Sequence, residues 1–190
     1  MRLEQSESSC WRVADPDWED PFDGSYSMRF GQRWNAPGSF PVTYLNANEA
    51  TARANAELML RKLEDIGVDV DDLEPGQLPV LIPCDVSDRT VLDVLSDAGC
   101  RDVGLESTYP REATGAVVPH SRCQPIGQRA WDDGLDGIAC RSAVLLTPRG
   151  EELAWFDRPG RRLVGSGPAE PHAPQRQRLA DRASPEPAPS

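Results

Sequence analysis

Residues 40–67 read FPVTYLNANEATARANAELMLRKLEDIG and contain the two clearest structural signals of the chain. The first part, Phe40 to Leu45, is short, β-branched and aromatic, which is typical of a strand. Asn48 is a good N-cap for a helix, and Glu49 places a negative charge where the helix dipole favours it. Gly67 supplies a C-terminal stop. The stretch therefore predicts a strand and then a helix over residues 48–66. The apolar residues of this helix recur along one stripe that we expect to face the core: Ala52, Ala56, Met59, Leu60, Leu63 and Ile66.

Outside this stretch, short apolar or β-branched runs between turn residues predict further strands. These runs cover residues 78–86, 90–94, 142–147, 153–156 and 162–164. A second helix is expected over residues 124–131. Few of the expected strands and helices alternate along this chain. The pattern therefore favours a mixed α+β domain over a doubly wound parallel sheet.

The length of 190 residues suits one core of ordinary size, and 38% hydrophobic with 27% charged residues is typical of globular proteins. From Ser166 onward the chain is rich in proline and has little to bury, so it has too little apolar burial to offset its ordering entropy. We expect one domain over residues 1–165 and a disordered tail over 166–190.

Charge and cysteine content exclude several classes of protein. A formal charge of −11 disfavours direct nucleic-acid binding, which rests on clustered basic residues. Five cysteines without a C-x-x-C pair suggest neither a disulfide framework nor a zinc ribbon. The N-terminus lacks the apolar core of a signal peptide, and no run of apolar residues is long enough to span a membrane. We therefore expect a cytoplasmic protein with reduced thiols.

A dense polar and aromatic region lies between residues 28 and 38, with Tyr44 and Glu57 downstream. Arg33 is able to give paired charge-assisted hydrogen bonds to a pyrophosphate, each contributing about 1.5–3 kcal/mol when shielded. Trp34 or Tyr44 offers a ring for stacking. The alternative is that Trp34 is a core anchor, Arg33 a surface cation and Glu57 an ordinary solvated helix residue.

Several separated motifs occur in the order seen in RES-domain proteins. They are Arg12, the run GQRWNAPG at 31–38, Tyr44, the stretch 52–57, QPIGQRAW at 124–131 and Arg141-Ser142-Ala143. Over about residues 10–165 the chain resembles toxins of this family, which is named for its arginine, glutamate and serine.

The resemblance implies a fold like that of ADP-ribosyltransferases, action on NAD⁺, and inhibition by a cognate antitoxin with an Xre-type helix-turn-helix domain. By position, it assigns Arg12 and Arg33 to anchoring the dinucleotide and Tyr44 to packing beside the nicotinamide end. It assigns Glu57 to the reacting ribose and Ser142 to the pocket. Arg33, Tyr44 and Glu57 are thus the expected catalytic residues, and Arg12 and Ser142 complete the NAD⁺ site.

One carboxylate suffices for such chemistry. Cleavage of the nicotinamide–ribose bond passes through an oxocarbenium-like state, and the cationic leaving group departs as neutral nicotinamide without a general acid. The site therefore needs an anion for the charge that develops on the ribose. Water as acceptor gives hydrolysis, phosphate gives phosphorolysis, and a protein side chain gives mono-ADP-ribosylation.

Two residues depart from the family pattern: Gln32 stands where a second glycine is common, and Asn55 is larger than usual at its position. These departures keep open a catalytically degenerate protein that only binds a partner. A serine hydrolase built on Ser142 and His120 is disfavoured because no G-x-S-x-G elbow surrounds the serine. No metal is expected, since the histidines and cysteines form no ligand spacing.

Overall fold

The computed structural model describes residues 1–146, 150–161 and 163–173. Its strands are β1 (Arg2–Gln5), β2 (Ser8–Ala14), β3 (Val42–Asn46), β4 (Val80–Val86), β5 (Arg89–Val94), β6 (Gly137–Arg141), β7 (Glu151–Phe156) and β8 (Glu170–Pro171). Its helices are α1 (Ser25–Phe30), α2 (Glu49–Asp65), α3 (Asp97–Asp102) and α4 (His120–Asp132), with short 3-10 turns η1 (Val70–Asp72) and η2 (Pro75–Gln77). This mixture of helices and strands around one sheet confirms the expected α+β class.

The described strands form a single sheet in the order β1-β5-β6-β7-β3-β2-β4-β8. All neighbouring strands are antiparallel except β5 and β6, which run parallel. The sheet is therefore mixed, as a chain with few strand–helix–strand units predicts.

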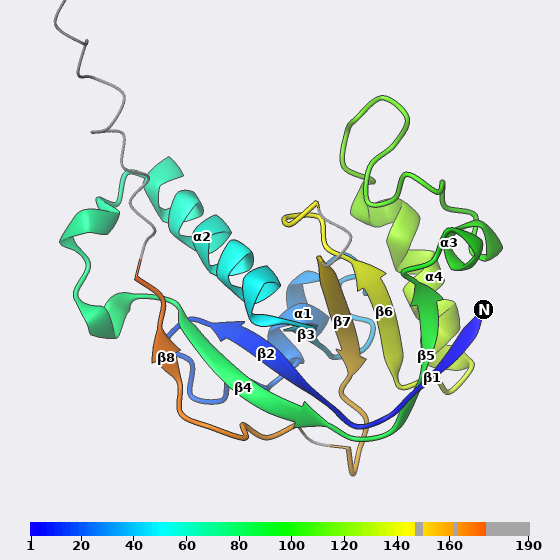
Figure 1. The fold of residues 1–190 in the computed structure, drawn as a ribbon, viewed down its shortest axis with the longest axis horizontal. Helices are drawn as coiled ribbons and strands as arrows, with labels where there is room; N and C mark the ends of the chain where they lie inside the picture. The colour runs from blue at the N-terminus through cyan, green and yellow to red at the C-terminus, as the bar shows by residue number, and fades with distance from the viewer. Residues whose placement is uncertain (147–149, 162, 174–190) are drawn as a thin grey trace, which may run out of the picture.

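One long antiparallel ribbon bends this sheet. β1 and β2 follow each other directly in the chain, as do β4 and β5, yet β1 pairs with β5 and β2 with β4. The ribbon turns at residues 6–7 and 87–88, and Figure 1 shows its two strands running side by side along the lower edge of the molecule. The bend curves the sheet around its core.

Two helices cover the curved sheet at opposite ends (Figure 1). Ala52 and Ala56 of α2 are fully buried against Val13 and Leu81, so small side chains let this helix lie close to β2 and β4. At the other end, α4 and α3 pack on the largest core cluster, which includes Trp34 and several residues of β6 and β7.

The strand and helix expected in residues 40–67 are confirmed. Asn48 caps α2 by accepting a hydrogen bond from the Thr51 backbone N–H, and Gly67 follows with a φ of 88°. The expected stripe is buried at Ala52, Ala56 and Leu60, whereas Ile66 is 76% exposed. The stripe prediction is wrong at Ile66 because the last turn of the helix extends beyond the sheet.

Three other expectations need correction. The strand predicted over 142–147 is wrong in its described part: β6 ends at Arg141, and residues 143–145 form a bend. Leu163 and Val164 form no strand, although Gly165 makes an isolated bridge with Cys84. The strands β1, β2, β6 and β8 and the short helices α1 and α3 were not predicted, and α4 is longer than the expected helix.

The expected boundary at Gly165 also falls too early. β8 pairs with β4 beyond it, and the backbone N–H of His172 donates to the carbonyl of Pro79 at 2.8 Å. The imidazole of His172 is completely buried. Residues 166–173 are therefore part of the packed domain, while the rest of the expected tail, residues 174–190, lies outside the described residues.

Candidate active site

A hydrogen-bonded loop carries Arg33 and is held by Tyr44. The Tyr44 hydroxyl accepts a hydrogen bond from the Trp34 backbone N–H at 3.0 Å and donates to Asn35 Oδ1 at 3.1 Å. The Asn35 amide is buried and donates to the carbonyls of Ser27 and Phe40. Tyr44 on β3 therefore fixes the two residues that directly follow Arg33.

The same loop rests on α4. Gly127 allows this contact, because a Cβ at its position would lie only 1.7 Å from the carbonyl oxygen of Trp34. Gln124 donates its side-chain amide to the carbonyl of Gln32 at 3.0 Å. Trp34 is fully buried in the largest core cluster, so it is a core anchor, and no face of its ring is open to a ligand.

Arg33 is half-buried beside polar side chains from several elements. Its Nη1 donates to the carbonyl of Val118 at 3.1 Å. Burial alone would lower the pKa of Arg33, but the facing Tyr109 hydroxyl and Cys123 thiol outweigh burial and leave that pKa raised. The pKa of His120, at the start of α4, is lowered by burial and then by the charges of Arg33 and Lys62. Arg33 therefore belongs to an electropositive region that includes Lys62 of α2.

Ser142 belongs to a second hydrogen-bonded group, centred on Glu152 of β7. Oε1 of Glu152 accepts hydrogen bonds from Ser142 Oγ at 2.7 Å and from Asn55 Nδ2 at 3.1 Å. Asn55 also donates to Asn46 Oδ1 at 2.7 Å. The group joins the end of β6, the start of β7, β3 and the first half of α2.

The charges of Arg33 and Glu152 both act on Tyr44 and Tyr109. Burial raises the pKa of Tyr44; Arg33 lowers it and Glu152 raises it further. Burial likewise raises the pKa of Tyr109, with the same opposed contributions from Arg33 and Glu152. Glu152 pairs with Asn46, two residues from Tyr44 on the same face of the sheet, and the Tyr44 hydroxyl binds the backbone next to Arg33. Arg33, Tyr44, Tyr109 and Glu152 therefore form one cluster that contains a cation and an anion.

Tyr109 adds a buried donor to this cluster. Its side chain is 1% exposed, and its hydroxyl has no hydrogen-bond partner among the described residues. Arg141 helps to place this segment, because its Nη1 donates to the carbonyl of Tyr109 at 3.1 Å. Sequence reasoning missed Tyr109 and Glu152, since neither stands in a run of polar and aromatic residues.

Glu57 lies elsewhere. Its Oε1 is 2.7 Å from Nε2 of His172, which follows β8 at the far edge of the sheet. Asn55 and Glu57 are two residues apart on α2, so their side chains leave the helix about 200° apart. Asn55 points toward β3 and β7, and Glu57 points toward β8. The structure therefore does not bring Glu57 to the cluster of Arg33 and Tyr44.

Arg12 reaches Tyr44 through the backbone. It donates from Nε to the carbonyl of Pro21 and from Nη1 to the carbonyl of Tyr44, both at 2.8 Å. Its guanidinium carbon lies 5.2 Å from the ring centroid of Trp18. Burial lowers the pKa of Arg12 to about 10, which still leaves it charged at neutral pH. Arg12 thus ties the segment after β2 to β3, and only Nη2 has no protein partner among the described residues.

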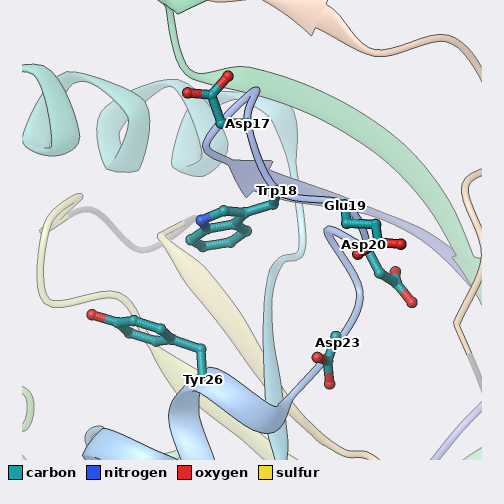
Figure 2. Close-up of a pocket in the computed structure, with 6 residues that line it drawn as sticks. All are labelled: Asp17, Trp18, Glu19, Asp20, Asp23 and Tyr26. Atoms are coloured by element: carbon teal, nitrogen blue, oxygen red, sulfur yellow. The ribbon is translucent and has the colours of Figure 1, made fainter.

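A surface hollow of about 670 Å³ lies beside Arg12, and Figure 2 shows the rings of Trp18 and Tyr26 at its sides. The two ring centroids are 6.3 Å apart. Its remaining lining is acidic: Asp17, Glu19, Asp20 and Asp23. These carboxylates would repel a pyrophosphate, so phosphate groups are better matched by the region around Arg33.

The described part of the chain contains no group of three or more histidine, cysteine, aspartate or glutamate side chains placed to hold a metal ion. All five cysteines are buried free thiols. Within the same residues, no helix is both long and apolar enough to cross a membrane.

The family model described as "RES domain" matches residues 9–178. Proteins described as "NAD(+) phosphorylase MbcT" from Mycobacterium bovis (strain ATCC BAA-935 / AF2122/97) and Mycobacterium tuberculosis (strain ATCC 25618 / H37Rv) are each 28% identical over 143 residues. These alignments cover 74% of this chain and 70% of each relative. A chain in the crystal structure of the M. tuberculosis MbcT-MbcA toxin-antitoxin complex matches with a TM-score of 0.66 and 25% identity, over 90% of this chain and 86% of that chain.

Proposed function

Since the chain belongs to the RES-domain family, we propose that it binds NAD⁺ and cleaves the bond between nicotinamide and ribose. Two observations outside the chain support this activity. The mycobacterial relatives are described as NAD⁺ phosphorylases, and the solved structure that it resembles holds a toxin with its antitoxin. Within the chain, the cluster of Arg33, Tyr44, Tyr109 and Glu152 carries the proposal.

Arg33 is the proposed anchor for the pyrophosphate. A guanidinium binds phosphate oxygens through paired hydrogen bonds, and partial burial strengthens them. Lys62 lies close enough to His120 and Arg33 to add positive potential. Helix α4 starts next to them at Pro119, where no side chain caps the helix, so its first N–H groups add a partial positive charge.

Tyr44 and Ser142 are proposed to shape the nicotinamide end of the site. Tyr44 keeps the Arg33 loop in place, and Ser142 fixes the carboxylate of Glu152. Arg12 supports the same region through the backbone of Tyr44. Glu57, assigned to the ribose by resemblance alone, is separated from this region by its contact with His172.

Phosphate is the proposed acceptor for the ribose, because the relatives are described as phosphorylases. Hydrolysis by water and transfer to a protein side chain are the competing outcomes. The test incubates the purified protein with NAD⁺, with and without inorganic phosphate, and measures free nicotinamide and the sugar product. We expect nicotinamide release that depends on phosphate, and a phosphorylated ADP-ribose.

Two results would point to another function. Transfer of label from NAD⁺ to proteins of a lysate would indicate a mono-ADP-ribosyltransferase. Calorimetric binding of NAD⁺ without nicotinamide release would indicate a degenerate domain that acts only through a partner. Gln32 and Asn55, the two departures from the family pattern, make this second result worth measuring.

An antitoxin of the Xre helix-turn-helix type is the proposed partner, and the cytoplasm is the proposed location, where NAD⁺ is available. The proposed RES-type domain begins at residue 1 and, because β8 is paired and His172 buried, continues past Gly165 to at least residue 173. Expression of the protein is expected to arrest growth, and Arg33→Ala to relieve the arrest. An arrest that persists in this variant at equal protein level would argue against NAD⁺ loss as its cause.

A further inference from the structure

We infer that Glu152, and not Glu57, is the carboxylate that faces the reacting ribose. This inference rests on the proposed function and specifies the anionic group of the same site. Glu152 pairs with Asn46 of β3, so its side chain lies on the face of the sheet that also carries Tyr44. Glu57, the carboxylate that the RES resemblance assigns to the ribose, leaves α2 on the side opposite to Asn55 and contacts His172.

The hydrogen bonds of Glu152 orient its carboxylate without neutralising it. Both are made to Oε1, and both donors, the Ser142 hydroxyl and the Asn55 amide, are uncharged. Among the described residues, Oε2 has no hydrogen-bond partner and Glu152 has no ion pair. Neutral donors place no positive charge beside the carboxylate, and its second oxygen remains available to a ligand.

The position of Glu152 suits a dinucleotide bound at Arg33. The Tyr44 hydroxyl binds the backbone next to Arg33, and Glu152 lies one residue pair further along β3 on the same face of the sheet. A pyrophosphate at Arg33 would therefore place the attached ribose toward Glu152. The buried Tyr109 hydroxyl, which has no partner among the described residues, offers this ligand a hydrogen-bond donor.

The reaction balances without a proton on Glu152. The bond from ribose C1′ to the nicotinamide nitrogen breaks, and its electron pair stays with the nitrogen, which becomes neutral. A phosphate oxygen then supplies the electron pair of the new bond to C1′. Glu152 neither gains nor loses a proton or electrons; its charge stabilises the positive charge that develops on C1′ and the ring oxygen.

Asn55 and Ser142 are positioning residues in this arrangement. Asn55 donates to Glu152 across 3.1 Å between α2 and β7, so the carboxylate and the amide occupy adjacent places. Exchanging them, with Asn55→Glu and Glu152→Asn in one protein, moves the carboxylate to the helix while keeping it in the same cluster. This double variant tests whether a negative charge at this place is sufficient, whichever of the two residues carries it.

The experiment measures nicotinamide release and NAD⁺ affinity for the wild type, Glu152→Gln, Glu57→Gln and Glu151→Gln. We expect Glu152→Gln to lose about 100-fold or more in kcat with a nearly unchanged Kd for NAD⁺, because removal of one preorganised charge-stabilising group has effects of this size. Glu57→Gln, and the neighbouring control Glu151→Gln, should stay within about threefold of the wild type. The exchanged double variant should recover at least tenfold over Glu152→Gln.

Each other outcome has a definite meaning. If Glu152→Gln folds and retains turnover within about threefold of the wild type, this inference is overturned and the proposed function stands. A loss of turnover in Glu57→Gln alone has the same meaning. If Glu152→Gln fails to fold, Glu152→Asp decides: a folded Glu152→Asp with unchanged kcat overturns the inference, and a lowered kcat at unchanged Kd supports it. A wild type that binds NAD⁺ and releases no nicotinamide overturns the proposed function and this inference together.

Discussion

The imidazole Nε2 of His172 lies 2.7 Å from Oε1 of Glu57, and this contact fastens the chain after β8 to helix α2. The His172 side chain has no exposed surface, whereas that of Glu57 is 26% exposed. The two residues are 115 positions apart in sequence. Glu57 therefore has a structural partner that explains its place on α2, and His172 makes the segment after Gly165 part of the domain.

Replacement of His172 should weaken the fold without affecting the active site. His172→Ala removes a buried ring and leaves the Glu57 carboxylate without this partner, so we expect a loss of about 2–3 kcal/mol in the free energy of unfolding. Urea denaturation measures this loss. His120→Ala, at an exposed histidine, is the control and should change stability by less than about 0.5 kcal/mol. Equal stability of the two variants would show that the contact between β8 and α2 contributes nothing.

Replacement of Arg33 should weaken NAD⁺ binding specifically. Each charge-assisted hydrogen bond to phosphate contributes about 1.5–3 kcal/mol, so Arg33→Ala should raise the Kd for NAD⁺ by about 10- to 100-fold. Arg29→Ala removes an exposed arginine of α1 and is the matched control. Isothermal titration calorimetry compares the two. An unchanged Kd in Arg33→Ala would move the pyrophosphate elsewhere, with Arg12 Nη2 as the next candidate.

The sequence predicts the fold well where one local signal suffices. Asn48, Glu49 and Gly67 delimit α2, and the β-branched run before it becomes β3, because caps and strand propensity act over a few residues. β2 escaped prediction although it lies near the centre of the sheet. Its residues, SSCWRVA, pair along their whole length with β4, which lies about 70 residues later in the chain, and at Trp11 with β3.

The candidate site could be predicted only in part, for a similar reason. Arg33 and Tyr44 stand close together in an unusual run and do come together in space. Local spacing on α2 cannot distinguish Asn55 from Glu57 as the inward residue, because both lie beside small side chains. The two directions are set by distant partners. Asn55 binds Glu152, 97 residues away, and Glu57 contacts His172, 115 residues away.

Removal of the Tyr44 hydroxyl should destabilise the loop that carries Arg33. Tyr44→Phe leaves the Trp34 backbone N–H without its acceptor in the protein interior, which costs about 1–3 kcal/mol. Tyr26→Phe, at a side chain that is 56% exposed, should cost less than about 0.5 kcal/mol. Denaturation by urea measures both. If Tyr44→Phe is as stable as the wild type, the loop is held by Asn35 and α4 alone.

The buried tyrosines should also make the protein lose stability at high pH. Burial raises the pKa of Tyr44 and of Tyr109 above the ordinary value of 10 in the folded chain, whereas in the unfolded chain both ionise near that value. The stability that they contribute is therefore fully present below pH 10 and falls as the pH rises toward their folded-state pKa values. Each tyrosine should account for about 1.4 kcal/mol per pH unit above 10. Urea midpoints between pH 8 and 11 measure the slope, and Tyr44→Phe should reduce it by the share of one tyrosine. A slope that is equal in this variant and in the wild type would mean that Tyr44 ionises at an ordinary pKa and is not shielded from water.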